Sequence, residues 1–299
     1  MSSQIPTQPI WKRFVRFVAD DGQEYCGEPV EADIDVGIAM SDGHDVTINI
    51  LDTSSGLSAA AKFTGETKKA KTILSPLTPA EVGTIRCIGL NYTDHAAEMK
   101  LALPKYPEIF FKPDTCVHGP MSSIIIPHQV AQEADPEVEL AVVIGKDCRN
   151  VSPAKALDYV LGYMTANDIT ARIIQGRGSQ WGYSKGFDGF APMGPCLVSA
   201  QAIPDPSVLL LKTTLNGTVM QDQPARNMIF SVPEVISYLS MGTTLRKGTV
   251  ILTGTPSGIG HSHNPPIYLA DGCKLRVSIS HGLGTLVNPV VQEGPIQLE

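Results

Sequence analysis

The sequence lacks the features that mark several large classes of proteins. Its six cysteines are scattered singly and form no Cys-x-x-Cys pair, which argues against a disulfide framework or a cysteine zinc site and is typical of reduced thiols in the cytosol. No apolar run approaches the roughly 20 residues that cross a bilayer. Residues 1–10 carry neither a signal-peptide core nor an Arg-rich amphipathic pattern. We therefore expect a cytoplasmic protein, with a mitochondrial location left open.

Positive charge and nucleotide-binding motifs are also scarce. The net charge of −7 and the pI of about 5.5 argue against nucleic acid or an anionic membrane as the main partner. There is no Gly-x-x-x-x-Gly-Lys-Ser/Thr, no Gly-x-Ser-x-Gly, and no Gly-x-Gly-x-x-Gly between a strand and a helix. The loop of residues 254–260 has backbone amides suited to an anion, but it matches neither phosphate-binding pattern. A nucleotide site is therefore not expected.

The composition that remains favours a folded, loop-rich β protein. Of 299 residues, 42% are hydrophobic and 18% charged, with few aromatics beside 27 glycines and 23 prolines. This length has room for one large domain with a small one. Residues 13–18 alternate like an edge strand, residues 46–51 predict another strand, and residues 57–71 predict a loop or short helix. With a proline-rich linker at residues 74–79, we expect a small β-rich N-terminal domain over residues 1–80 and a second domain over residues 81–299.

A strand with two carboxylates at its start organises the second domain. In Asp135-Pro-Glu137-Val-Glu139-Leu-Ala-Val-Val-Ile-Gly145 the side chains of Glu137 and Glu139 leave the same face, because strand side chains alternate. The apolar run from Leu140 to Ile144 predicts burial on both faces. Two adjacent anions are tolerated beside a cation or beside water, so this segment alone fits a metal site and a solvated strand end equally well.

A third carboxylate favours the metal. Asp168 lies near the end of another short strand that begins at Gly162. Three carboxylates without a neighbouring Cys or His suit a hard divalent cation, Mg²⁺ before Mn²⁺ or Ca²⁺. Taken alone, Asp168 is more simply interpreted as the N-cap of a helix that begins at Ile169.

Two further segments hold candidate catalytic residues. His95 and Glu98 share one face of a predicted helix capped at Asn91 or Thr93, and a glutamate beside a histidine makes it a better general base. Spacing alone favours an ordinary exposed helix pair. Lys185 stands among aromatic residues, where a snorkelling side chain is the simpler interpretation than a buried lysine beside an anion.

The order of these segments resembles the fumarylacetoacetate hydrolase superfamily, and specifically its domain-containing branch. Singly the motifs are unspecific, but jointly they cover roughly residues 85–290 in the order of the family. They are Gly89-Leu-Asn-Tyr-Thr-Asp-His-Ala-Ala-Glu98, Glu137-Val-Glu-Leu-Ala-Val-Val-Ile-Gly145, Asn167-Asp-Ile-Thr-Ala-Arg172, Gln180-Trp, Lys185-Gly-Phe-Asp188 and Thr253-Gly-Thr-Pro256.

The resemblance implies a fold, a metal site and a set of catalytic residues. The fold is a β-rich α+β structure with a distorted β-roll core over residues 81–299, usually in a homodimer. The metal is Mg²⁺, or Mn²⁺ or Ca²⁺, held by Glu137, Glu139 and Asp168. The resemblance also places a His95–Glu98 dyad on a lid segment, and it places Lys185, Thr255 and, less securely, Gln175 against the substrate.

The activity implied is cleavage of a C–C bond in a small anionic 2-oxo or 1,3-diketo acid through a metal-bound enolate, by hydrolysis or decarboxylation. Keto–enol tautomerisation of oxaloacetate is the main alternative, because all three reactions share that enolate. A non-catalytic metal-binding protein is less expected, since such a protein need not keep carboxylates, dyad and lysine together. Two departures lie beside the expected pocket: Ile173 follows Thr-Ala-Arg172 where relatives often have Asp, and residues 173–179 are unlike the usual sequence.

Overall fold

The computed structural model describes residues 9–58 and 60–295. Most of the segment searched for a targeting pattern, residues 1–8, lies outside the described residues. Within the described part, the chain is rich in strands and has six short α-helices, which confirms the expected β-rich α+β class. No described helix has the length and apolarity needed to cross a membrane.

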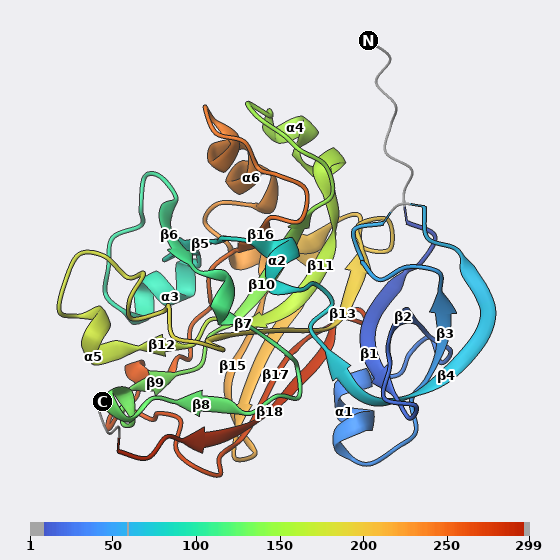
Figure 1. Ribbon diagram of the computed structural model, residues 1–299. Coiled ribbons are helices and arrows are strands. Elements are labelled where there is room, and N and C mark those ends of the chain that lie inside the picture. Colours follow the sequence, from blue (N-terminus) through green and yellow to red (C-terminus); the bar gives the residue numbers. More distant parts are fainter. Residues whose placement is uncertain (1–8, 59, 296–299) are drawn as a thin grey trace.

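The strands form one eleven-stranded sheet, one five-stranded sheet and one two-stranded ribbon (Figure 1). The elements are β1 Arg13–Ala19, β2 Glu24–Pro29, α1 Val36–Ser41, β3 Thr47–Leu51, β4 Phe63–Leu74, α2 Pro79–Val82, β5 Ile85–Gly89, α3 Thr93–Glu98, β6 Glu108–Lys112, β7 Val117–His118, β8 Ile124–Ile126, β9 Ala134–Asp135, β10 Val138–Ile144, α4 Pro153–Ala156, β11 Val160–Asn167, β12 Thr170–Ala171, α5 Arg172–Gln175, β13 Ala191–Ser199, β14 Leu210–Leu215, β15 Thr218–Pro224, α6 Val232–Ser240, β16 Val250–Leu252, β17 Lys274–Ile279 and β18 Gly284–Gln292.

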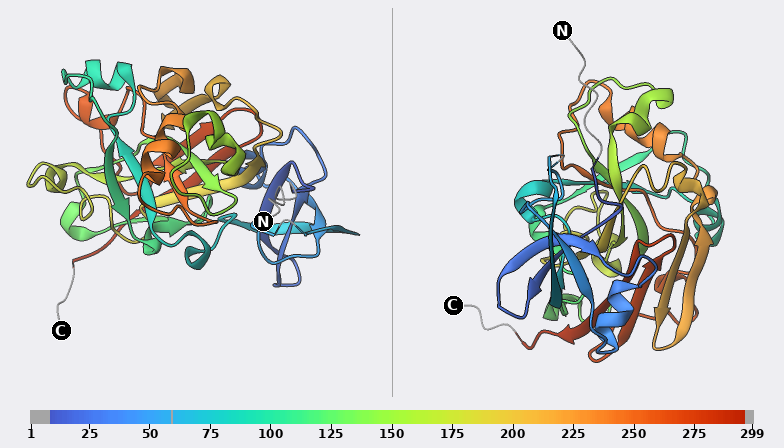
Figure 2. Two further views of the ribbon diagram at one scale, coloured as in Figure 1. Left: turned by 90° about the horizontal axis from the view of Figure 1, so that it is seen from above. Right: turned by 90° about the vertical axis from the view of Figure 1, so that its right-hand side faces the viewer.

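The N-terminal strands differ in two ways from the sequence-based expectation. β1 is not an edge strand, because it pairs with β2, β4 and, near its start, β13. The charged side chain of Arg13 in β1 is buried, and its guanidinium donates to the carbonyl oxygens of Ala32 and Ile34. β4 is a long strand where a loop or short helix was expected, because β1 and β3 give its polar residues a hydrogen-bonding ladder. Strands β1 to β4 of the eleven-stranded sheet lie at one end of the molecule (Figure 2). A domain boundary at residue 80 remains a prediction.

β10 lies at the centre of the large sheet. Every side chain of β10 is buried, as its apolar sequence predicts, because β11 and β16 flank it and the five-stranded sheet covers it through β14 and β17. β11 and β16 both run antiparallel to β10, and β5 runs parallel to β16. The first residues of β10 therefore meet the last residues of β11, β16 and β5 at one edge of the sheet.

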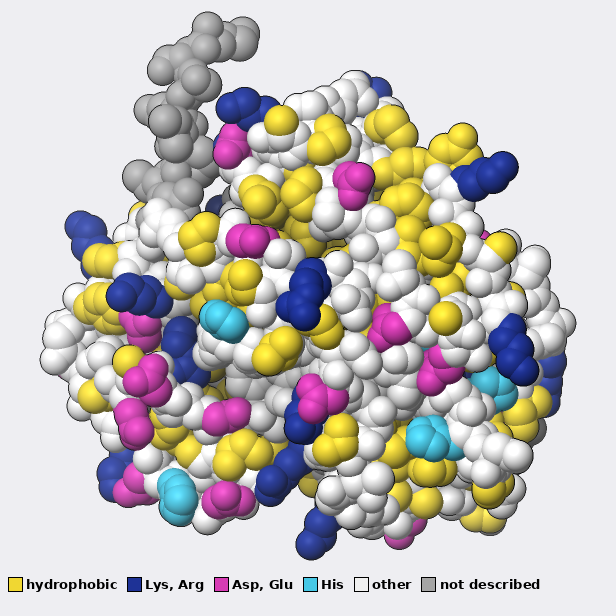
Figure 3. All heavy atoms as spheres, turned by 180° about the vertical axis from the view of Figure 1, so that it is seen from behind, with side chains coloured by type: hydrophobic (Ala, Val, Ile, Leu, Met, Phe, Trp, Pro, Cys, Tyr) yellow, Lys and Arg dark blue, Asp and Glu magenta, His cyan; other side chains and the backbone are white. Residues whose placement is uncertain are grey.

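The five-stranded sheet is ordered β15-β14-β17-β18-β8. The hairpin between β14 and β15 turns at Asn216 and Gly217, whose φ angles of 51° and 83° are those of the tight turn predicted from the Asn-Gly pair. On the face of the molecule seen in Figure 3, acidic and basic side chains are interspersed.

The helix that carries the candidate dyad is shorter than expected and begins differently. α3 follows Tyr92, which makes no side-chain capping bond, so the expected caps at Asn91 and Thr93 are wrong. The Asn91 amide instead donates to the carbonyl oxygens of Thr253 and Phe230. These bonds tie the start of α3 to the loop that follows β16, and so fix the dyad next to the edge where β10 begins.

Candidate functional site

Three carboxylates converge where β10 begins and β11 ends. Glu137 precedes β10, Glu139 is its second residue, and Asp168 follows β11; one oxygen from each lies within 4.8 Å of the others. Their exposed fractions are only 4%, 1% and 0%. The antiparallel pairing of Val138 with Asn167 brings them together. The expected convergence is therefore present, and the burial excludes a solvated strand end.

Two lysines lie against this cluster. The Lys185 ammonium donates to Glu137 at 3.0 Å, to Asp168 at 2.6 Å and to the Thr170 hydroxyl at 2.7 Å. Lys185 is 3% exposed, so the snorkelling interpretation is wrong. Lys112 is fully buried and donates to Asp168 at 2.5 Å. The N-cap interpretation of Asp168 is wrong too, because its side chain binds these ammonium groups.

Arg172 forms the third cationic contact. Its guanidinium donates to Asp135 at 2.8 Å, to Glu137 in a short contact, and to the Gln175 side-chain oxygen at 3.1 Å. Sequence reasoning assigned no role to Lys112 or Arg172. Arg172 stood in a recognised motif, but Lys112 carried no signal beyond its place at the end of an apolar strand, and only the tertiary fold brings it to Asp168.

Glu139 differs from the other two carboxylates because no lysine or arginine pairs with it among the described residues. Its hydrogen bond comes from the Gly254 amide at 2.7 Å. Burial raises the pKa of Glu139 well above its ordinary value, and the charges of Asp168 and Glu137 raise it further. Burial would also raise the pKa of Glu137, but Lys185 and Arg172 outweigh it and lower that pKa to about 2.

This donor set fits one hard divalent cation. Carboxylate oxygens within 4.8 Å of one another can share an ion whose bonds are roughly 2.0–2.6 Å long. The cluster contains only oxygen donors, as Mg²⁺, Mn²⁺ and Ca²⁺ prefer. A cation here would also supply Glu139 with the positive partner that the lysines and Arg172 give to Glu137 and Asp168.

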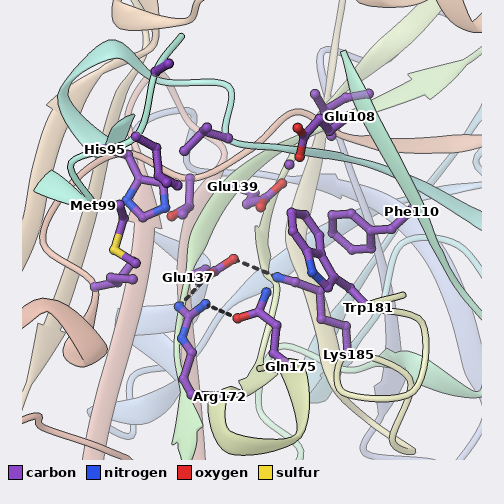
Figure 4. A pocket seen from close by; sticks show the side chains of 17 residues that line it. His95, Met99, Glu108, Phe110, Glu137, Glu139, Arg172, Gln175, Trp181 and Lys185 are labelled. Carbon is purple, nitrogen blue, oxygen red and sulfur yellow. Dashed lines mark hydrogen bonds and ion pairs between the residues drawn. The ribbon is translucent and has the colours of Figure 1, made fainter. Parts of the chain in front are cut away.

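His95 lies on the other side of the same pocket (Figure 4), where it is paired with Glu98. Their side chains meet at 3.0 Å through Nδ1 of His95, and Nε2 has no hydrogen bond within the described part of the chain. The other oxygen of Glu98 accepts from the Gly258 amide at 2.8 Å and the Ser262 hydroxyl at 2.7 Å. Burial would raise the pKa of Glu98, but the hydrogen bonds from His95, Ser262 and Gly258 lower it. His95 is 8% exposed, so the interpretation as an exposed helix pair is wrong.

Gln175 and Thr255, the two residues expected to bind substrate, differ from each other in the hydrogen bonds that their side chains make. Gln175 lines the pocket, and its side-chain oxygen is fixed by Arg172, which leaves its amide NH₂ group for a ligand. Thr255 also lines the pocket, but its hydroxyl donates to the Val138 carbonyl at 2.9 Å and accepts from Gln221 at 2.8 Å. These two bonds indicate a structural role for the hydroxyl, and a contact between Thr255 and the substrate stays a prediction.

The pocket that joins these groups has a volume of about 310 Å³. It is lined by Ile88, Gly89, Leu90, His95, Met99, Leu101, Ala102, Glu108, Phe110, Glu137, Glu139, Arg172, Gln175, Trp181, Lys185, Thr255 and Ile259. His95 of the dyad, Glu137 and Glu139 of the carboxylate cluster, and an apolar wall thus line one small cavity, as general acid–base chemistry at a bound cation requires.

Comparisons with known proteins identify the family of the chain. The family model described as "Fumarylacetoacetate (FAA) hydrolase C-terminal" matches residues 84–291. A caffeoylpyruvate hydrolase of Neonothopanus nambi is 41% identical over 294 residues, which cover 96% of each chain. A mitochondrial oxaloacetate tautomerase of Rattus norvegicus is 39% identical over 221 residues, which cover 74% of this chain and 69% of that protein. The structure of a 2-hydroxyhepta-2,4-diene-1,7-dioate isomerase from Mycobacterium marinum matches with a TM-score of 0.77 at 34% identity, over 95% of this chain and all of that one.

The chain therefore belongs to the fumarylacetoacetate hydrolase family, and its fold is the β-rich fold of that family, as expected. The relatives are named as hydrolases, tautomerases and isomerases, so this chain is an enzyme of that group.

Proposed function

We propose that the chain is an Mg²⁺-dependent hydrolase that cleaves the C–C bond of an acylpyruvate, a 1,3-diketo acid with one carboxylate beside the inner keto group. The observation that carries the proposal is that His95, which is paired with Glu98, lines the same pocket as Glu137 and Glu139 of the carboxylate cluster. The caffeoylpyruvate hydrolase supports this reaction over others, because it matches over 96% of both chains.

In this proposal Glu137, Glu139 and Asp168 hold the cation. When bound, the divalent cation would polarise a keto oxygen of the substrate and stabilise the enolate that remains after cleavage. Lys185 keeps Glu137 and Asp168 in place through its hydrogen bonds and adds positive charge to the pocket wall that faces the reacting carbonyl.

The dyad supplies the attacking water. Nε2 of His95 removes a proton from a water molecule as its oxygen attacks the outer keto carbon. Glu98 holds Nδ1 and stabilises the imidazolium, because its carboxylate is fixed by Gly258 and Ser262. The bond between the outer keto carbon and the methylene carbon then breaks. The electron pair stays on the pyruvate part as an enolate, which takes a proton at carbon, so that one water and one acylpyruvate give one carboxylic acid and pyruvate.

Gln175 is the proposed contact for the substrate carboxylate. Its amide oxygen is held by Arg172, so the amide group presents its two N–H donors to the pocket. A neutral donor suits this place, because the guanidinium of Arg172 is already bonded to Asp135 and Glu137.

The second candidate is keto–enol tautomerisation of oxaloacetate, favoured by the tautomerase that is 39% identical over 74% of this chain. It needs His95 to move a proton between carbon and the enol oxygen, and it needs no attacking water. Decarboxylation of oxaloacetate would use the same enolate with still less demand on His95.

A homodimer in the cytoplasm is part of the proposal. A monomer by light scattering at micromolar concentration would contradict the dimer.

A substrate screen tests the proposal. Acetylpyruvate, fumarylacetoacetate and oxaloacetate are each incubated with the protein in Mg²⁺ and in a chelator, and the products are separated by chromatography. Hydrolysis of a diketo acid in Mg²⁺, lost in the chelator, is the expected result. Enolisation of oxaloacetate without cleavage of any diketo acid would replace the first candidate with the second, and turnover that is unchanged in the chelator would overturn both.

A further inference from the structure

The wall of the pocket beyond the carboxylates is apolar and aromatic. Trp181 and Phe110 form it with their rings edge to face, 5.6 Å between centroids and at 65° to one another. Met99 and Leu101 add flexible apolar surface. In Figure 4 the two rings lie together on the opposite side of the pocket from His95 and Met99. A flat apolar group fits a wall built in this way.

The position of Trp181 is fixed by the backbone that it covers. A β-carbon added at Gly89 would lie 2.3 Å from the Trp181 ring, so the indole packs directly on a residue that has no side chain. Phe110, the other ring of this wall, contacts the carboxylate cluster: the Lys185 ammonium lies 4.8 Å from the centroid of the Phe110 ring. The aromatic wall is therefore held between the end of β5 and the lysine of the carboxylate cluster.

The positively charged side chains that line the pocket are already bonded to protein groups. Of the cations that line the pocket, Lys185 donates to Glu137, Asp168 and Thr170, and all three nitrogens of Arg172 are bonded to protein oxygens. Glu108, at the exposed start of β6, also lines the pocket and carries a negative charge. It is the one charged lining residue that belongs neither to the carboxylate cluster and its partners nor to the dyad. Figure 4 shows Glu108 at the opposite end of the pocket from Arg172 and Gln175.

We propose that the acyl group of the substrate is an uncharged aromatic group seated against Trp181 and Phe110, and that Glu108 rejects acyl groups that carry a second carboxylate. The proposal rests on the proposed function, because it assigns the inner carboxylate and keto group of the substrate to the Gln175 end. It makes Glu108 a specificity-determining residue, since no cation in this wall is free to offset a second negative charge.

A matched substrate pair tests the proposal. Benzoylpyruvate and 4-carboxybenzoylpyruvate differ by a single carboxylate at the far end of the ring. The wild-type protein should prefer benzoylpyruvate by about tenfold in kcat/KM, the size expected when two like charges approach near a protein surface. Glu108→Gln should narrow this preference, and Glu108→Lys should reverse it. Glu66→Lys, at an exposed position on β4, makes the same change in net charge away from the pocket and should leave the preference unchanged.

Binding to the turnover-deficient variant His95→Ala separates this proposal from the proposed reaction. Calorimetry should show tighter binding of benzoylpyruvate than of its 4-carboxy derivative, and the difference should shrink in the double variant with Glu108→Gln. If binding shows this preference but the wild-type protein hydrolyses neither compound, the proposed hydrolysis fails and the specificity holds. If both compounds are hydrolysed equally, or if Glu108→Lys keeps the wild-type preference, the role of Glu108 is refuted while hydrolysis stands.

Discussion

Lys112 and Asp168 form an ion pair that is fully withdrawn from solvent. The ammonium nitrogen lies 2.5 Å from a carboxylate oxygen, and both side chains are 0% exposed. Lys112 also donates to the carbonyl oxygen of Phe190 at 2.7 Å. One lysine at the end of β6 therefore fixes both the carboxylate that follows β11 and the backbone that precedes β13.

Loss of this lysine should destabilise the fold. Lys112→Met leaves the buried carboxylate of Asp168 with Lys185 as its one remaining lysine partner, beside two other carboxylates. Removal of one partner of a buried pair costs about 3–5 kcal/mol. Urea unfolding in a chelator measures the loss. The control is Lys212→Met, because the pair of Lys212 and Asp222 is 43% and 52% exposed and such pairs contribute about 0–1 kcal/mol. Equal stability of the two variants would contradict the structural role of Lys112.

Thr255 should behave as a structural residue. Thr255→Val removes the hydroxyl that bonds to Val138 and Gln221, and an unsatisfied buried polar group costs about 1–3 kcal/mol. The free energy of unfolding should fall by that amount, while KM for the acylpyruvate stays close to the wild-type value. A large rise in KM without loss of stability would restore the direct substrate contact that the sequence alone suggested.

Gln175 should show the opposite pattern. Its amide NH₂ group is the proposed donor to the substrate carboxylate, and a hydrogen bond to a charged group contributes about 1.5–3 kcal/mol. Gln175→Ala should therefore lower kcat/KM by roughly 10- to 150-fold, mainly through KM, with stability nearly unchanged. Steady-state kinetics beside thermal unfolding distinguishes the two variants, and an unchanged KM would remove Gln175 from the site.

Acid should weaken the contact that holds the dyad. The pKa of Glu98 in the folded protein lies below its ordinary value of 4.5, so the ionised carboxylate stabilises the fold. That contribution is complete above about pH 4.5 and is lost as the pH falls through the lower folded-state pKa. The difference in melting temperature between the wild-type protein and Glu98→Gln should be constant above pH 4.5 and shrink below it. A difference that grows toward low pH would contradict this sign.

The sequence predicted the parts of this site that follow from local pattern. The alternation of Glu137 and Glu139 before an apolar run indicated both the carboxylate pair and the buried strand, and the three oxygens do lie within 4.8 Å once Asp168 is added. The Asn216-Gly217 turn followed from backbone preferences. These features depend on residues that are close in the chain, where propensity and periodicity carry information.

What the sequence did not predict depends on tertiary contacts. Lys112 reaches Asp168 across 56 residues of chain, and the burial of Lys185 is visible only once the carboxylates surround it. The polar sequence of β4 gave no strand signal, because its order comes from hydrogen bonds to β1 and β3. The Thr255 hydroxyl is held by the side chain of Gln221 in β15, which is 34 residues away in the chain.

The most direct test of the proposed division of roles is a paired measurement of Mg²⁺ affinity and turnover in two single variants. His95→Ala should bind Mg²⁺ nearly as tightly as the wild-type protein and turn over about 10²- to 10⁴-fold more slowly, the usual loss of a general base. Glu139→Gln should show the opposite pattern, with its main defect in Mg²⁺ affinity. A much smaller loss of turnover in His95→Ala would favour decarboxylation over hydrolysis. If His95→Ala loses Mg²⁺, or keeps both affinity and full turnover, the assignment of the carboxylates to the metal and of the dyad to proton transfer is contradicted.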